Sequence, residues 1–126
     1  MELAWHSSSL PDGSYAGTPC GWLLDVSGRL VYVAGDTAVF SDMERIGRRR
    51  DGRRLDVAIL PIGDLFTMGP DASREAIRLL APKLVLPCHY DTWPPIAQDA
   101  AAWARGVESD GVAAARVLKP GESVTL

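Results

Sequence analysis

The sequence contains little cysteine, no long apolar run and no excess of basic charge. Its two cysteines do not make the disulfide framework of a small secreted domain. No apolar stretch approaches the roughly 20 residues that span a bilayer. The net charge of −3 gives no general reason to expect binding to nucleic acid or to an anionic membrane. Residues 1–6 also lack the basic start and apolar stretch of a signal peptide. We therefore expect a cytoplasmic protein that binds neither nucleic acid nor a membrane.

What the sequence does contain is enough apolar material for a core. Of the 126 residues, 47% are hydrophobic and 23% are charged, as in an ordinary globular protein. Neither repeats nor low-complexity segments interrupt the chain. At this length we expect one domain or less.

The apolar pattern predicts one mixed sheet with helices packed on it, an α/β (α+β) fold. Two apolar runs, 21–26 and 29–34, are separated by Ser27-Gly28, which is typical of a β-hairpin. Further strands are predicted at 2–6, 55–61, 83–88, 117–118 and 123–126. Helices are predicted at 41–46, 72–80 and 96–107, with Ser41 and Asp71 as N-caps and Pro82 after the second helix.

Three polar residues each follow a predicted strand. They are His6, Asp36 and His89, and the two histidines are the only ones in the sequence. In open α/β sheets, ligands bind at the carboxyl ends of the strands, because the connecting loops converge there. Two imidazoles and a carboxylate suit zinc or another first-row divalent metal. We therefore predict that these three side chains form a metal site at one edge of the sheet, although each alone also fits an ordinary surface or turn position.

Several motifs around these residues resemble those of a known family. They are Trp5-His6-Ser7-Ser8-Ser9, Tyr32-Val33-Ala34-Gly35-Asp36-Thr37, Leu60-Pro61-Ile62-Gly63-Asp64, Phe66-Thr67-Met68-Gly69-Pro70 and Pro87-Cys88-His89-Tyr90. In this order and spacing they resemble the later motifs of the uncharacterised metal-dependent hydrolases of the metallo-β-lactamase superfamily, which are similar to the ascorbate-phosphate lactonases. The resemblance extends from Trp5 to Leu126.

The resemblance implies a fold, a cofactor and an activity. The family fold is a four-layer αββα sandwich, of which residues 1–126 would be the C-terminal half. His6 would bind a first metal ion, His89 a second, and Asp36 would bridge both and take part in catalysis. The metal would be zinc, with manganese or iron as alternatives. A metal-bound hydroxide would attack a lactone, ester, amide or phosphodiester bond of a small-molecule substrate.

The resemblance also indicates residues around the metals. The candidates for orienting a ligand or lining the substrate site are Asp64, Thr67, Met68, Tyr90, Asp91 and Trp93. Asp91 and Leu65 stand where Asn is usual in the family. Cys88, beside His89, is interpreted as a packed residue rather than an additional ligand.

One motif of the family is absent from this sequence. The first metal motif, His-x-His-x-Asp-His, does not occur in it. Each ion would therefore have two protein ligands, whereas a catalytic zinc site normally has three. One hypothesis is a metal-dependent hydrolase completed by an N-terminal-half partner chain or by a homo-oligomer, joined through an exposed apolar sheet face. The alternative is a truncated, non-catalytic remnant that binds metal weakly or serves as a protein-interaction domain.

Overall fold

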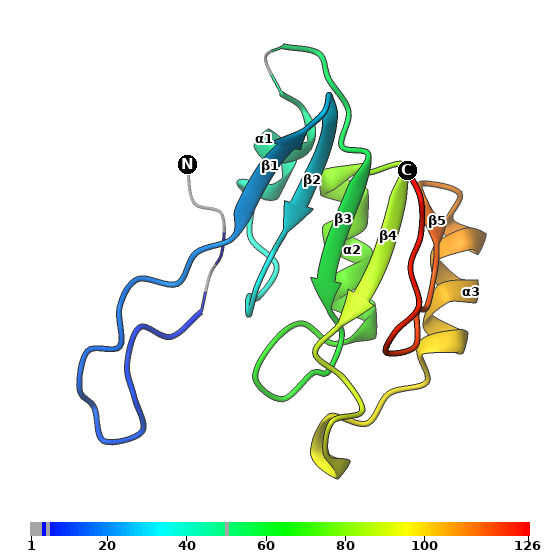
Figure 1. Cartoon of the computed structure of the whole chain (residues 1–126). Coiled ribbons are helices and arrows are strands. Elements are labelled where there is room, and N and C mark those ends of the chain that lie inside the picture. Colours follow the sequence, from blue (N-terminus) through cyan, green and yellow to red (C-terminus); the bar gives the residue numbers. More distant parts are fainter. Residues whose placement is uncertain (1–3, 5, 50) are drawn as a thin grey trace.

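The chain forms one five-stranded sheet with helices on one face (Figure 1). A computed structural model describes residues 4, 6–49 and 51–126. The strands are β1 (Trp22–Val26), β2 (Arg29–Val33), β3 (Val57–Pro61), β4 (Leu84–Cys88) and β5 (Ala114–Ala115). The helices are α1 (Met43–Gly47), α2 (Pro70–Leu80), the short 3₁₀ turn η1 (Pro94–Ile96) and α3 (Ala100–Asp110). The mixed α/β architecture that the sequence predicts is confirmed.

The order of the strands across the sheet follows their order in the chain. β1 and β2 form the predicted antiparallel hairpin, and Ser27 and Gly28 both have positive φ, as a two-residue hairpin turn requires. β2, β3, β4 and β5 are all parallel. Parallel strands end at the same edge of a sheet, which we call the carboxyl edge. Because Trp22 at the start of β1 pairs with Val33, the segment before β1 reaches this edge as well.

One face of the sheet packs against the helices and forms the core. Tyr32, Leu60 and Val85 are fully buried there, and burial raises the pKa of the Tyr32 hydroxyl well above its usual range. The helices contribute the buried residues Met43, Ile46, Ala76, Ile77, Leu80, Trp103 and Val107. The Trp103 indole Nε1 donates a 2.7 Å hydrogen bond to Ser73 Oγ, which joins α3 to α2.

The other face of the sheet is apolar, and Figure 1 shows α1 and α2 on the far side from it. The register places two apolar rows across β1 to β4: Trp22, Val33, Ile59 and Leu86, then Leu24, Val31, Val57 and Leu84. Trp22 is 61% exposed and Leu24 is 40% exposed. We call this surface the open face. Val57 is 2% exposed and the other residues of the two rows are at least partly exposed, and an apolar surface of this kind is typical of an interaction site.

The edge of the sheet opposite the carboxyl edge, which we call the amino edge, is held by a buried acid. The Asp56 carboxylate accepts hydrogen bonds from Lys83 Nζ at 2.8 Å and from the Leu30 backbone N–H at 2.9 Å, and it pairs with Arg29 at 3.4 Å. The hydrogen bond from Lys83, followed by that from Leu30, lowers the pKa of Asp56 to about 2. Asp56 therefore links the starts of β2, β3 and β4.

Both longer helices begin at other residues than the sequence predicts. α2 begins at Pro70 after the N-cap Gly69, so Asp71 lies in the first turn and is not the cap. Proline is well placed at N1, where its missing N–H leaves no hydrogen bond unmade. Asp99 accepts from the Ala102 N–H as the N-cap of α3, which therefore starts later than the predicted helix at 96–107. The cap of α1 is Asp42, not Ser41.

The ends of the chain show the largest differences from the prediction. The predicted strands at 117–118 and 123–126 are wrong: the last strand is β5, in which Ala114 and Ala115 pair with Leu84 and Val85 of β4. The predicted strand at 2–6 falls mostly outside the described residues, and Ala4 and His6 are not in a strand. Of the described helices, none combines the length and apolarity needed to span a bilayer.

Candidate functional site

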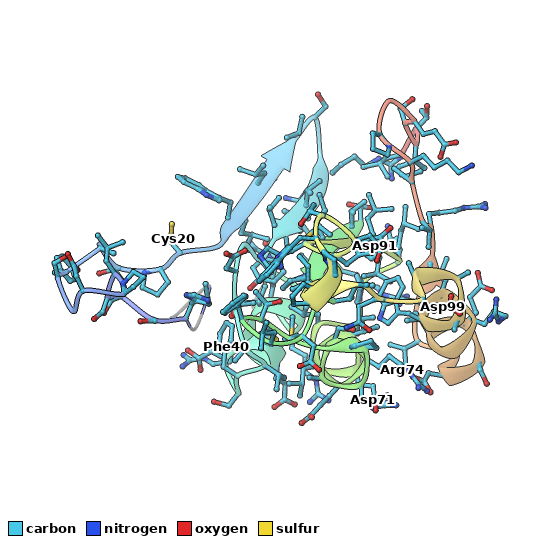
Figure 2. The ribbon with its side chains drawn as sticks, turned by 90° about the horizontal axis from the view of Figure 1, so that it is seen from below. Cys20, Phe40, Asp71, Arg74, Asp91 and Asp99 are labelled. Carbon is cyan, nitrogen blue, oxygen red and sulfur yellow. The ribbon has the colours of Figure 1, made fainter. Side chains whose placement is uncertain are left out.

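The loops after β2, β3 and β4 lie at the carboxyl edge, and Figure 2 looks onto this edge, with Asp91 near its centre and Cys20 well to the side. Six described residues other than glycine have positive φ, and four of them lie in the loops after β3 and β4: Asp64, Leu65, His89 and Asp91. Side chains rarely adopt this left-handed region, and such strain concentrates at functional sites. The carboxyl edge is therefore the candidate functional site.

Asp36 and His89 face each other at this edge. Asp36 Oδ2 lies 3.7 Å from His89 Nε2, with side-chain exposures of 54% and 30%. This separation exceeds that of a hydrogen bond. Two ligand atoms each about 2.1 Å from one tetrahedral metal ion lie about 3.4 Å apart. The nitrogen and oxygen donors of His89 and Asp36 thus fit a shared divalent metal ion.

The His89 ring is held from its other side. Its Nδ1 is buried and has no hydrogen-bond partner in the described part of the chain, an uncommon state for a buried nitrogen. Gly63 packs against this residue: a Cβ built there would lie 2.2 Å from the His89 carbonyl oxygen and 3.3 Å from Nδ1. A residue larger than glycine at position 63 would therefore displace His89.

His6 is placed against the loop after β3. Its Nε2 hydrogen-bonds to the Phe66 carbonyl oxygen at 3.0 Å, while Nδ1 lies 3.4 Å from the Ser7 carbonyl oxygen. Among the residues that the structure describes, no group of three or more His, Cys, Asp or Glu side chains is arranged to hold a metal ion. The structure thus brings together Asp36 and His89 but does not add His6 to them.

The other predicted site residues lie in the loops after β3 and β4. Thr67 is half-buried, whereas Met68 is only 2% exposed and packs in the core, where its N–H donates to the Thr37 carbonyl. Asp64 is exposed, and its backbone carbonyl accepts hydrogen bonds from the N–H groups of Phe66 and Thr67. These contacts form a tight turn that carries the exposed Phe66 side chain.

The loop after β4 is built around Asp91. Its Oδ1 accepts a 2.8 Å hydrogen bond from the Gln98 N–H, and its own N–H donates to the Ile96 carbonyl. Tyr90 is half-buried, and its pKa is raised by burial and by the charge of Asp91. Trp93 is 47% exposed and stacks on Phe66, with ring centroids 6.2 Å apart and planes 15° from parallel.

Cys88 has the character expected of a packed thiol. Burial, and then the charge of Asp36, raise its pKa to about 11. Without a bound metal ion, the thiol is therefore protonated at neutral pH.

Sequence reasoning missed three residues of this edge as site residues. Gly63 contacts His89, Phe66 stacks on Trp93, and the Gln98 side chain donates from Nε2 to the Gly63 carbonyl at 3.2 Å. One signal was present: Leu65-Phe66 is an apolar pair inside a turn-forming segment. The spatial partners of the pair come from another loop and leave no local pattern.

The chain is similar to proteins of one superfamily. Residues 3–90 match the sequence profile of a family described as "Beta-lactamase superfamily domain". A "UPF0173 metal-dependent hydrolase" of Thermus thermophilus is 52% identical over 98% of this chain. One of Deinococcus radiodurans is 48% identical over 100% of it. The chain covers 53% of each of these two relatives, and thus spans about half of their length.

A solved structure gives the same result for the fold. Igni18, a metallo hydrolase from the archaeon Ignicoccus hospitalis, superimposes with a TM-score of 0.81 at 40% sequence identity. The match covers 96% of this chain and 49% of Igni18.

Proposed function

We propose that this chain, which belongs to the beta-lactamase superfamily and within it to the UPF0173 metal-dependent hydrolases, forms the C-terminal half of a metal-dependent hydrolase. One observation carries the proposal. Asp36 and His89, which follow two different strands of the parallel sheet, meet with their donor atoms 3.7 Å apart. Nothing in the packing of the core requires an exposed carboxylate beside an imidazole there.

The two residues have different roles in this proposal. Asp36 supplies negative charge that attracts a cation, and His89, which packs against Gly63, supplies a nitrogen ligand. A bound divalent ion, zinc or else manganese or iron, would polarise the scissile bond and lower the pKa of water, so that hydroxide is available at neutral pH. The bond broken is that of a lactone, ester, amide or phosphodiester. Asp91 and Thr67 lie in the loops that surround this pair.

His6 is proposed as a further ligand that changes its partner. Its Nε2 is bonded to the Phe66 carbonyl, and the ring has to leave that oxygen before it can bind a metal ion. The exchange replaces one partly exposed hydrogen bond, which contributes about 1 kcal/mol, with a coordination bond. The His6–Phe66 contact would then be the resting arrangement of the site.

The remaining ligands would come from a second half. The chain covers about half the length of its relatives, and the open face presents two apolar rows that a second sheet would bury. Such a half would complete an αββα sandwich, with its ligands at the carboxyl edge. A second copy of this chain could cover the face but would contribute only the same residues.

The alternative function is a non-catalytic domain that binds metal weakly or contacts another protein. The observation in its favour is that the described residues include no cluster of three ligands. The hydrolase and the non-catalytic domain would differ in how many metal ions they bind and in whether they hydrolyse a substrate. A single set of measurements therefore separates them.

Metal titration tests the proposal. We expect zinc titrated into the chain to bind at one site per chain, and Asp36→Asn or His89→Ala to weaken binding at least tenfold. Asp71→Asn is the matched control, because Asp71 is a fully exposed acid on α2, and it should leave the affinity unchanged.

A hydrolysis assay tests the activity. The metal-loaded chain is mixed with the N-terminal half of the Thermus relative, and hydrolysis of 4-nitrophenyl acetate that a chelator abolishes would support the hydrolase. Metal binding that ignores Asp36 and His89 would contradict it.

A further inference from the structure

The carboxyl edge carries exposed aromatic and aliphatic side chains beside the proposed metal ligands. Leu65, Phe66 and Trp93 are 60%, 55% and 47% exposed. Phe66 and Trp93 come from different loops and stack on each other. A monomeric surface rarely gathers large apolar side chains without a binding partner for them. We call these three residues the aromatic platform.

The platform is held rigidly in its exposed position. Asp64 and Leu65 adopt consecutive left-handed conformations, with φ of 62° and 49°. For a leucine this conformation costs about 1 kcal/mol or more. The N–H groups of Phe66 and Thr67 both donate to the Asp64 carbonyl, and the turn is closed by a bond from the Asp64 N–H to the Met68 carbonyl. Strain of this kind persists because the surrounding bonds impose it, and its effect here is to turn Leu65 and Phe66 outward.

The loop that carries Trp93 is tied to the same turn. The Gln98 side chain donates to the Gly63 carbonyl, and the Ile62 N–H donates to the Cys88 carbonyl. The Phe66–Trp93 stack therefore joins two segments that are already linked through their backbones. A preorganised surface loses little conformational entropy when a ligand binds to it.

A hollow lies between His6 and two members of the platform, Leu65 and Phe66. It has a volume of about 560 Å³ and is lined by His6, Ser7, Ala38, Leu65, Phe66 and Thr67. Ala38 lies two residues beyond Asp36, and Trp93 lies four residues beyond His89. A ligand group in the hollow would contact Leu65, Phe66 and the proposed ligand His6.

The charges around the platform are of one sign. Residues 30–44, 55–73 and 84–104, which include the three loops of this edge, contain no lysine or arginine. The same loops carry Asp36, Asp64 and Asp91. A phosphate group is normally recognised by arginine, lysine or a helix N-terminus. No lysine or arginine of these loops would pair with an anionic group on the platform, so the proposed metal ion would be the cation that such a group meets.

We propose that the aromatic platform binds a flat apolar group of the substrate, which is an uncharged ester, lactone or amide. This inference rests on the proposed hydrolase function and narrows it. Hydrolysis adds the oxygen of water to the acyl carbon, breaks the bond from that carbon to oxygen or nitrogen, and returns a proton to the departing alcohol or amine. Phe66 and Trp93 take no part in these bonds, and they determine which acyl compound is held.

Two probes that share a phenyl ring and differ in charge test the platform without metal. Benzylacetone is neutral and is not hydrolysed, whereas diphenyl phosphate is an anionic phosphodiester. We expect benzylacetone to shift the Trp93 indole N–H signal in ¹H–¹⁵N spectra of the full chain, with that signal assigned through Trp93→Phe. Phe66→Ala should weaken this binding at least fivefold. Diphenyl phosphate should bind at least fivefold more weakly than benzylacetone.

Trp22 provides the matched control. It is 61% exposed, and it lies on the open face rather than at the platform. Its indole signal should not follow the Trp93 shift, and Trp22→Ala should leave the affinity for benzylacetone unchanged. Equal shifts of both signals, an unaltered affinity in Phe66→Ala, or equal binding of diphenyl phosphate would overturn the inference. Metal binding that ignores Asp36 and His89 would overturn the hydrolase proposal alone, because the probe experiment contains no metal.

Discussion

The two edges of the sheet use acidic residues in opposite ways. At the amino edge, Asp56 has three partners, and its pKa is lowered to about 2. At the carboxyl edge, Asp36 is half-exposed and lies 3.7 Å from His89 without a hydrogen bond between them. The amino edge satisfies its own charges and stabilises the fold. The carboxyl edge leaves donor atoms facing each other, as a binding site must.

Backbone strain follows the same division. The left-handed residues Asp64, Leu65, His89 and Asp91 all lie at the carboxyl edge. Elsewhere among the described residues, such non-glycine residues occur only in the hairpin turn and at the end of α2, at Ser27 and Ala81. Changes at the amino edge should therefore alter stability alone, while changes at the carboxyl edge should alter ligand binding.

Two glycines give the strongest test of this comparison. A Cβ at Gly63 would lie 2.2 Å from the His89 carbonyl, and a Cβ at Gly47 would lie 2.4 Å from the Leu80 carbonyl. We expect either substitution by alanine to lower the free energy of unfolding by about 3 kcal/mol, because backbone has to move in both. Only Gly63→Ala should weaken zinc binding by the folded protein, which calorimetry would measure below the unfolding transition. Equal loss of zinc affinity in Gly47→Ala would contradict the division.

Asp56→Asn should have the next largest effect, and only on stability. We expect a loss of about 1–2 kcal/mol at neutral pH, since Lys83 and Arg29 are half-exposed and water screens their charges. The folded pKa of about 2 lies below the unfolded value of 3.8, so the contribution is complete above pH 4 and is lost as pH falls toward 2. Urea titrations of both proteins between pH 2 and 6 should show the difference shrinking across that window. A constant difference would be inconsistent with the pairing.

Leu65→Gly should have the smallest effect and the opposite sign. Glycine adopts the left-handed conformation freely, so the substitution should raise stability by up to about 1 kcal/mol. Leu10→Gly is the control, because Leu10 is 51% exposed and its φ is not positive. It should be neutral or destabilising. A loss of stability in Leu65→Gly would show that Leu65 is not strained.

The elements that could be predicted are those whose structure is determined by their own residues. Ser27-Gly28 determines the hairpin turn, and the aliphatic runs of β3 and β4 predict strands in any context. The pair of alanines in β5 has low strand propensity and pairs only because β4 lies beside it. The apolar residues at 117–118 look more like a strand, yet the sheet does not use them. Tertiary contact with β4 therefore determines which residues near the C-terminus form the last strand.

The same distinction separates the parts of the site. Asp36 and His89 could be predicted to meet, since parallel strands bring their loops to one edge. The position of His6 could not, because its partner is the Phe66 carbonyl, and that oxygen is placed by the left-handed turn at Asp64 and Leu65. A leucine in that conformation contradicts local preference, so no propensity predicts it.

The strand order of the sheet has a consequence for synthesis on the ribosome. Because β1 to β5 are neighbours in the same sequence as in the chain, each strand pairs with one that has already been made. None waits for a later segment to be inserted between two others. Each parallel pair still has to close a loop of more than 20 residues, which slows folding relative to a hairpin. The three loops that carry Asp36, Asp64 and His89 are nevertheless completed one after another as the nascent polypeptide emerges.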